Sequence, residues 1–290
     1  MDETRILITG AHGQLGLALQ KRFPQALALD RDSLDISDEA SVTAFDWSKV
    51  DTIINAAAYT NVDGAETPEG RAAAWLANGT AVANLAEAAN AHDLNLVHIS
   101  SEYVFDGTQA PHHEGEPFTP LGVYAQTKAA GDLAASVAPK HYILRASWVI
   151  GEGKNFVRTM IMLADKGVSP TVVSDQTGRL TFTTTLVEAI EHLLTTKADY
   201  GTYNVSNDGE SASWADITRA IFKELGRDDL TVTDTTTAEY FASKPEAAPR
   251  PLLSEMDLSK IKATGLQLRD WRQELHDYIK QEQVKPKEQI

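Results

Sequence analysis

The first half of the chain alternates short apolar runs with longer stretches in which apolar side chains recur with the helical period. The runs are mostly apolar, as parallel strands covered by helices on both faces are. They lie at residues 5–9, 26–30, 51–55, 94–100 and 142–146. This alternation predicts consecutive βα units, and therefore an α/β fold with a Rossmann-type doubly wound parallel sheet.

The pattern loosens after residue 150. Residues 268–279 have the spacing of a terminal amphipathic helix, and residues 282–290 resemble a frayed end. We therefore expect a dinucleotide-binding Rossmann domain in residues 1–150 and a smaller, mainly substrate-binding region in residues 151–290. Residues 181–200 are expected to return to the first domain.

Composition and charge narrow the function. The hydrophobic fraction of 42% and the charged fraction of 23% are those of a soluble globular protein. Cysteine is absent, which excludes disulfides, thiolate catalysis and cysteine-bound metals. A formal charge of −15 argues against a nucleic-acid partner, whose surface needs a basic footprint. No basic leader or membrane-length apolar run is visible, so we expect a cytoplasmic protein without a membrane partner.

Two polar segments allow more than one interpretation. Residues 145–181 hold five basic and three acidic side chains, which suits either an anionic small molecule or a mixed solvated surface. Residues 112–116 hold two histidines and two glutamates, which suggests a metal cluster. Their nearly consecutive spacing on a predicted loop favours a solvated loop instead, so we predict no metal ligands there.

The first apolar run leads into a glycine-rich turn and then a helical pattern. In such a unit glycines allow a tight turn and a close approach of the backbone to a pyrophosphate, which the helix N-terminus attracts. The spacing is G-x-x-G-x-x-G, and the alternative is a tight turn without a ligand. With strand and helix both present we favour a dinucleotide. The predicted phosphate-binding residues are Gly10, His12, Gly13, Gln14, Leu15 and Gly16.

The second run ends on Asp30, at the position where an acid binds the ribose hydroxyls of NAD. Arg31 follows directly and could instead receive the 2′-phosphate of NADP, so both NADH and NADPH stay open. Further cofactor contacts are expected near the adenine and after the third run, where small side chains let the cofactor lie against the backbone. These residues are Asp35, Ile36, Ala56, Ala57, Ala58 and Tyr59.

Ser101, Tyr124 and Lys128 have the arrangement of a carbonyl reductase. Tyr124 and Lys128 are four residues apart on a predicted helix and therefore share a face, and an adjacent ammonium lowers the pKa of a phenol. Ser101 follows the fourth run, where its hydroxyl can hold a carbonyl oxygen. A nicotinamide would supply hydride and Tyr124 the proton. Tyr124 and Lys128 are both expected to contact the cofactor, Lys128 at the nicotinamide ribose.

Together these segments resemble the extended short-chain dehydrogenase/reductases, and within them the dTDP-4-dehydrorhamnose reductases, along essentially the whole chain. The resemblance is also carried by residues 55–66, 101–107, 145–148, 155–156, 175–178 and 250–251. It implies NADPH- or NADH-dependent reduction of the 4-keto group of dTDP-4-dehydro-L-rhamnose to dTDP-L-rhamnose, by a monomer or homodimer. It implies substrate contacts from Glu66, Ser101, Glu102, Tyr103, Trp148, Asn155 and Arg250.

Two of these substrate residues can also be read from their chemistry. Arg250 is suited to a diphosphate because its guanidinium is a fork-shaped cation. The pattern around Trp148 fits a core aromatic residue and a stacking platform equally well.

The chain departs from the family pattern at a few positions. Ser101 stands where threonine is usual, Glu102 where aspartate is common, and Leu180 where proline is. Ala125 and Thr127 replace the frequent glycine and serine between Tyr124 and Lys128. Some family members bind magnesium at a dimer contact, but this sequence offers no ligand set that supports a magnesium cofactor.

Two other functions stay open. A nucleotide-sugar epimerase or dehydratase of the same superfamily would retain its cofactor through the cycle, and a dehydratase would use an acid beside the serine, as Glu102 is. A non-catalytic regulatory relative would keep the fold and lose the chemistry. The intact Ser101, Tyr124 and Lys128 argue against that last alternative.

Overall fold

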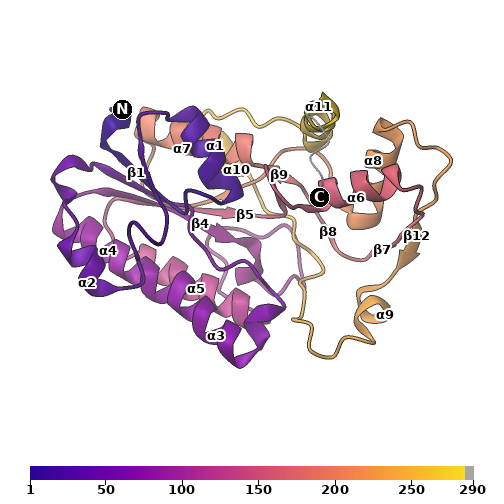
Figure 1. Cartoon of the computed structure of the whole chain (residues 1–290), viewed down its shortest axis with the longest axis horizontal. Coiled ribbons are helices and arrows are strands. Elements are labelled where there is room, and N and C mark those ends of the chain that lie inside the picture. Colours follow the sequence, from indigo (N-terminus) through magenta and orange to yellow (C-terminus); the bar gives the residue numbers. More distant parts are fainter. Residues whose placement is uncertain (285–290) are drawn as a thin grey trace.

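The computed structural model describes residues 1–284, which form a six-stranded parallel sheet flanked by helices and, beside it, a smaller lobe (Figure 1). The strand order is β10-β5-β4-β3-β1-β2 and every pairing in this sheet is parallel. The predicted doubly wound sheet is confirmed. Its strands are β1 (Ile6–Thr9), β2 (Leu27–Leu29), β3 (Thr52–Asn55), β4 (Asn95–Ser101), β5 (His141–Ala146) and β10 (Gly201–Val205).

The two faces of the sheet carry separate hydrophobic cores, which explains why the strands are apolar at consecutive positions. Ile6 and Ile8 of β1 belong to one core, whereas Leu7 between them belongs to the other. Successive strand side chains point to opposite faces, so a strand buried on both faces needs apolar residues throughout. The first face is covered by α1 (Gln14–Arg22), α7 (Thr183–Thr196) and α10 (Ser259–Ala263). The second is covered by α2 (Glu39–Ala44), α4 (Ala81–Ala91) and α5 (Val123–Ala135).

Helix α3 (Pro68–Trp75) runs into α4 without a non-helical break. The residues between them form the π-helical turn η4 (Leu76–Thr80), in which Asn78 is buried. The remaining short turns are of the 3-10 type: η1 (Glu3–Arg5), η2 (Trp47–Lys49), η3 (Gly64–Glu66) and η5 (Glu102–Val104).

The smaller lobe has its own core, built around Trp271, Leu275 and Ile279 on one face of the terminal helix. Its helices are α6 (Phe156–Asp165), α8 (Trp214–Glu224), α9 (Thr237–Phe241) and α11 (Trp271–Val284). Three two-stranded sheets complete it: β6 (Val149–Ile150) with β9 (Thr181–Phe182), β7 (Thr171–Val173) with β12 (Thr233–Thr235), and β8 (Thr177–Gly178) with β11 (Ala212–Ser213).

Helix α7 and strand β10 return from the second half of the chain to the Rossmann sheet. Leu186 and Ile190 of α7 pack in the same core as Leu15 and Leu19 of α1, and β10 pairs with β5. The returning segment therefore runs beyond residue 200, through Val205. The division into residues 1–150 and 151–290 stays a prediction.

The predicted frayed end is wrong for residues 282–284, which are the last residues of α11. Glu282 forms an ion pair with Arg158 of α6, with 2.6 Å between carboxylate and guanidinium, and this contact between helices holds the end of α11. Residues 285–290 lie outside the described part of the chain. Within residues 1–284, no helix is both long and apolar enough to cross a membrane.

Candidate active site

The glycine turn after β1 is packed so closely that it requires glycine. Gly10 has a φ of +75°, and a Cβ there would lie 2.6 Å from the backbone nitrogen of Ala57. A Cβ at Gly16 would overlap the carbonyl oxygen of Gly10. Gly13 is the N-cap of α1 and has no side chain to occupy the amide groups of the first turn. The backbone amides of the first turn and the positive end of the helix dipole are therefore available at the glycine turn, as the binding of a phosphate requires.

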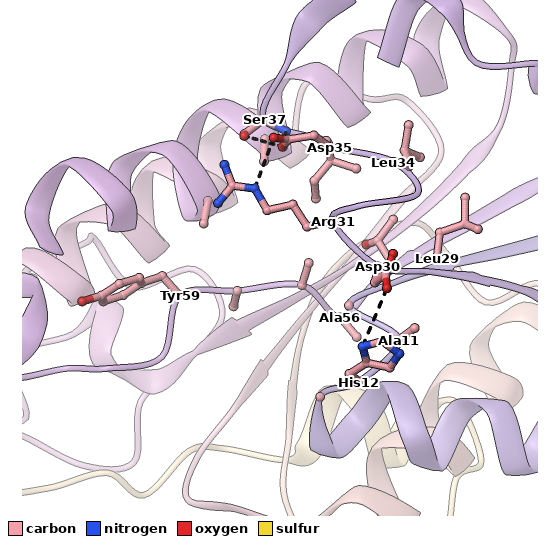
Figure 2. A pocket seen from close by; sticks show the side chains of 18 of the residues that line it. Ala11, His12, Leu29, Asp30, Arg31, Leu34, Asp35, Ser37, Ala56 and Tyr59 are labelled. Carbon is pink, nitrogen blue, oxygen red and sulfur yellow. Dashed lines mark hydrogen bonds and ion pairs between the residues drawn. The ribbon is translucent and has the colours of Figure 1, made fainter. Parts of the chain in front are cut away.

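A cavity of about 590 Å³ opens over the carboxyl ends of β1, β2 and β3 (Figure 2). Here β2 and β3 lie on opposite sides of β1, and open α/β sheets bind ligands at such a switch point. Its volume is in the range of small-molecule sites. Of the predicted cofactor residues it is lined by Gly10, His12, Gly13, Asp30, Arg31, Asp35, Ile36, Ala56, Ala57, Ala58 and Tyr59, but not by Gln14, Leu15, Gly16, Tyr124 or Lys128. The residues present fit a dinucleotide.

Asp30 and Arg31 lie at one end of this cavity and have different partners. Asp30 accepts hydrogen bonds from the backbone and hydroxyl of Ser33, at 3.0 and 2.8 Å, and these bonds lower the pKa of its carboxyl. Arg31 donates to the carboxylate of Asp35 at 3.2 Å, and its side chain is largely exposed. An ionised Asp30 suits ribose hydroxyls and the exposed guanidinium of Arg31 suits a 2′-phosphate, so the geometry accommodates NADH and NADPH alike.

Tyr59 lines the cavity at the end of the segment that follows β3. In Figure 2 its ring points away from the other labelled side chains, and it packs beside Ala65, Ala74 and Val123. Asn78 in the π-turn accepts from the backbone nitrogen of Tyr59 at 2.8 Å and donates to its carbonyl oxygen at 3.1 Å. Sequence reasoning assigned Asn78 no role, because its partners are distant in the chain.

Ser101, Tyr124 and Lys128 come together from two neighbouring elements. Ser101 ends β4, and its hydroxyl accepts from the backbone nitrogen of Tyr103 at 3.2 Å. Tyr124 and Lys128 lie one turn apart in α5, which packs against β4. The ring of Tyr124 meets that of Tyr103 edge-on, with 5.7 Å between centroids. The predicted catalytic residues therefore share one place in the fold, at the carboxyl end of β4.

The pKa of Tyr124 is shifted opposite to the sequence-based expectation. Burial raises it well above the usual value, the nearby charge of Glu102 adds to the rise, and the contact with Ser101 acts the other way. The ammonium of Lys128 donates to the carbonyl oxygen of Ile99 at 2.6 Å. Lys128 is 2% exposed, and burial lowers its pKa to about 8, while Asp132 acts to raise it.

Trp148 is packed against a second tryptophan and remains partly exposed, and its role as a stacking platform stays a prediction. It follows β5 with a φ of +44°, a backbone conformation that side chains rarely adopt and that often marks functional sites. One face of its ring stacks on Trp214 of α8, with 3.8 Å between centroids and 20° between planes. The ring is partly exposed. Nothing in the local pattern of the sequence pairs Trp214 with Trp148.

The side chains of Glu66 and Asn155 form hydrogen bonds within the protein. A carboxylate oxygen of Glu66 accepts from the backbone nitrogen of Val123, the first residue of α5, at 2.8 Å. Asn155 caps α6 by accepting from the backbone of Arg158 at 3.0 Å, and its amide donates to the hydroxyl of Tyr278 at 2.9 Å. Both hold helices in place, and their substrate contacts stay predictions.

Arg250 connects the smaller lobe to the loop after β3. Its guanidinium donates to a carboxylate oxygen of Asp63 at 2.7 Å and to the carbonyl oxygen of Ala248 at 2.8 Å. The same oxygen of Asp63 also accepts from the backbone nitrogen of Ala248. A diphosphate bound by Arg250 would therefore compete with Asp63, and this substrate contact stays a prediction.

The solvated loop expected at residues 112–116 is wrong for His112, which is fully buried. Its ring stacks on Phe105 with 4.5 Å between centroids, one nitrogen lies 2.9 Å from the carboxylate of Glu116, and the other lies 3.0 Å from the carbonyl oxygen of Leu253. These contacts fasten the loop to the protein. Among residues 1–284, no three histidine, aspartate or glutamate side chains are grouped to hold a metal ion.

The basic side chains of residues 145–181 are largely paired within the protein. Ion pairs join Arg145 to Asp132 at 2.8 Å, Arg158 to Glu282 at 2.6 Å, and Arg179 to Glu255 at 2.6 Å. The local excess of basic residues is therefore used mainly in tertiary contacts, and the pair of Arg145 with Asp132 is buried.

Comparison with known proteins agrees with this geometry. Residues 4–284 match the family model of the RmlD substrate binding domain. A dTDP-4-dehydrorhamnose reductase of Aggregatibacter actinomycetemcomitans is 39% identical, over 93% of this chain and 97% of its own. The spore coat polysaccharide biosynthesis protein SpsK of Bacillus subtilis (strain 168) is 36% identical, over 96% and 98%. A probable dTDP-4,6-dihydroxy-2-methyloxan-3-one 4-ketoreductase of Streptomyces antibioticus is 38% identical, over 94% of each chain.

Solved structures agree as well. A dTDP-4-dehydrorhamnose reductase of Clostridium acetobutylicum ATCC 824 is similar with a TM-score of 0.89 and 36% identity, over 96% of this chain and 99% of that one. A dTDP-4-dehydrorhamnose reductase of Bacillus anthracis, solved in complex with NADP, has a TM-score of 0.87 and 33% identity over the same shares.

Proposed function

The chain belongs to the family of the RmlD substrate binding domain, and we propose that it reduces the 4-keto group of dTDP-4-dehydro-L-rhamnose to give dTDP-L-rhamnose. The observation that carries the proposal is the meeting of Ser101, Tyr124 and Lys128 at the carboxyl end of β4, in the same sheet edge as the dinucleotide cavity. These three groups can hold a ketone oxygen, protonate it and bind the cofactor ribose. The resemblance to this family, and relatives that are named dTDP-4-dehydrorhamnose reductases, support the same reaction.

NADPH or NADH is the proposed reductant. When bound, the reduced nicotinamide supplies a hydride, with its two electrons, to the C4 carbon of the sugar. The turn of Gly10 and Gly13 would hold the pyrophosphate, and Asp30 or Arg31 would hold the adenosine ribose or its phosphate. A homologue solved in complex with NADP supports NADPH as a reductant, and NADH is proposed beside it. Magnesium is not part of the proposal.

Tyr124 carries the proton for the new hydroxyl. Because its pKa is raised, the phenol is protonated at neutral pH and ready to donate as charge develops on the ketone oxygen. Ser101 holds that oxygen, and Lys128, whose pKa is about 8, is mostly cationic at neutral pH and would bind the nicotinamide ribose. The hydride reaches carbon and the proton reaches oxygen, which balances the reduction.

The sugar nucleotide is proposed to bind between the two lobes. Glu66, Glu102, Tyr103, Trp148, Asn155 and Arg250 are the predicted contacts. The exposed part of Trp148 supplies an apolar surface for a ring, and Arg250 a cation for the diphosphate. We also propose that the protein acts in the cytoplasm, as a monomer or homodimer, without a nucleic-acid partner.

A second candidate function is 4-keto reduction of a different dTDP-deoxysugar. The relative from Streptomyces antibioticus favours it, because a protein named as a ketoreductase for another dTDP-linked sugar is 38% identical. The reacting groups would be unchanged, and only the contacts to the sugar ring would differ. An epimerase or dehydratase is less favoured: a dTDP-glucose 4,6-dehydratase is only 18% identical and shares the fold alone.

The test is a panel of dTDP-4-keto-6-deoxyhexoses offered to the purified protein with NADPH and with NADH. Oxidation of the cofactor is followed by absorbance, and the product is identified by NMR. We expect the largest kcat/KM with dTDP-4-dehydro-L-rhamnose, and dTDP-L-rhamnose as the product. Faster turnover of another sugar would establish the second candidate, and no oxidation with any sugar would exclude both.

A further inference from the structure

A carboxyl group lies buried beside the hydroxyl of Ser101 and takes no part in the hydride and proton transfers described above. Glu102 is 3% exposed, and its carboxylate lies 2.8 Å from the hydroxyl oxygen of Ser101, which donates to it. None of the ion pairs formed within residues 1–284 includes Glu102. A buried carboxylate without a cationic partner is costly, so its protonation state is open to change.

The groups packed around Glu102 come from four parts of the fold. Ser101 approaches from β4, Tyr103 from η5, Tyr124 from α5, and Ser254 from the segment that pairs with β8. Burial raises the pKa of Glu102 to about 7, and the hydrogen bonds of Ser101 and Ser254 act the other way. The charge of Glu102 contributes to the raised pKa values of both tyrosines. Arg250 is the cation that acts on Tyr103, and its charge opposes the rise in the pKa of that phenol.

The direction of the hydrogen bond between Ser101 and Glu102 decides what Ser101 can do. A serine hydroxyl has one proton to donate. When Glu102 is ionised, that proton is held by the carboxylate, and only lone pairs of Ser101 face a ketone oxygen. The carboxylate charge also opposes the negative charge that develops on that oxygen. When Glu102 is protonated, its own O–H can donate to Ser101 and leave the serine proton free.

We propose that Glu102 is a positioning residue that, in its protonated form, donates to the hydroxyl oxygen of Ser101 and directs the serine proton to the ketone oxygen of the substrate. This inference rests on the proposed reductase function. No covalent bond forms or breaks in this step, because the proton that reaches the product comes from Tyr124. Ionisation of Glu102 turns Ser101 away from the ketone and slows the reduction.

The test compares the pH profiles of kcat/KM for wild type, Glu102→Gln and Glu87→Gln. The control residue Glu87 is exposed on α4. Wild type and control are expected to lose activity as the pH rises through about 7, and again through about 8 as Lys128 loses its charge. Glutamine keeps an N–H donor at every pH, so the profile of Glu102→Gln should lack the first step and show only the second, which belongs to Lys128. At pH 8, one unit above the first step, loss of the Lys128 charge halves the activity of both proteins, and ionisation of Glu102 lowers that of the wild type a further tenfold. The wild type should therefore retain roughly a twentieth of its plateau and the variant about half of its own.

A Glu102→Gln profile with the same first step as the wild type would overturn the proposal. Ser101→Ala and Ser101→Thr provide a second test that does not alter the buried carboxyl. Ser101→Ala should be slow and lack the first step, and Ser101→Thr, which restores a hydroxyl, should regain it. Persistence of the step in Ser101→Ala would show that Glu102 acts without Ser101 and would also overturn the proposal. Failure of the wild type to reduce any keto sugar would instead refute the proposed function.

Discussion

At the scale of single residues, the site depends on positions where the surrounding backbone accommodates only one residue type. Gly10 is the clearest case, because its positive φ and the backbone of Ala57 both exclude a Cβ. The same closeness lets a pyrophosphate approach the backbone. Lys128 is a contrasting case: its position follows from helical spacing, but its ammonium is directed to Ile99 by tertiary packing.

Gly10→Ala is therefore expected to weaken the binding of NADPH and NADH by at least about tenfold and to lower the free energy of unfolding by roughly 2 kcal/mol. Cofactor titration by fluorescence and denaturant unfolding measure the two effects. Gly115→Ala is the matched control, because a Cβ there meets nothing within 4 Å. Equal cofactor affinity in the two variants would refute the role given to the turn.

At the scale of elements, α5 is the part that the reaction depends on most. It carries Tyr124 in its first turn and Lys128 in its second, and its N-terminal amide at Val123 donates to the carboxylate of Glu66. A carboxylate at a helix N-terminus is stabilised by the helix dipole as well as by the hydrogen bond. The cap on α5 therefore fixes the start of the helix and the direction of the Tyr124 side chain.

Removing this cap separates a positioning role from a substrate contact. Glu66→Ala is expected to lower stability by roughly 0.5–2 kcal/mol and kcat by about 10- to 100-fold, with little change in cofactor affinity. Glu87→Ala, at an exposed site on α4, should change neither quantity. If Glu66→Ala raises KM and leaves kcat intact, Glu66 acts by binding the sugar nucleotide, as the family resemblance implied.

At the scale of the whole molecule, the features that could be predicted from the sequence are those coded by neighbouring residues. The glycine turn, the apolar parallel strands and the four-residue spacing of Tyr124 and Lys128 are of this kind. The stacking of Trp214 on Trp148, the burial of His112 and the return of β10 to the sheet depend on contacts between distant segments. Periodicity and spacing carry no information about such contacts, and the raised pKa of Tyr124 arises from the same tertiary burial.

The central claim is that Tyr124 protonates a sugar ketone, and that the dinucleotide cavity binds its cofactor without the Tyr124 hydroxyl. The most direct measurement is single-turnover reduction of dTDP-4-dehydro-L-rhamnose by Tyr124→Phe, alongside cofactor titration and circular dichroism of the same variant. We predict a native spectrum, wild-type cofactor affinity and a rate reduced by roughly 10²- to 10⁴-fold, since phenylalanine keeps the ring and removes the proton. A Tyr124→Phe protein that turns over at the wild-type rate would contradict the account.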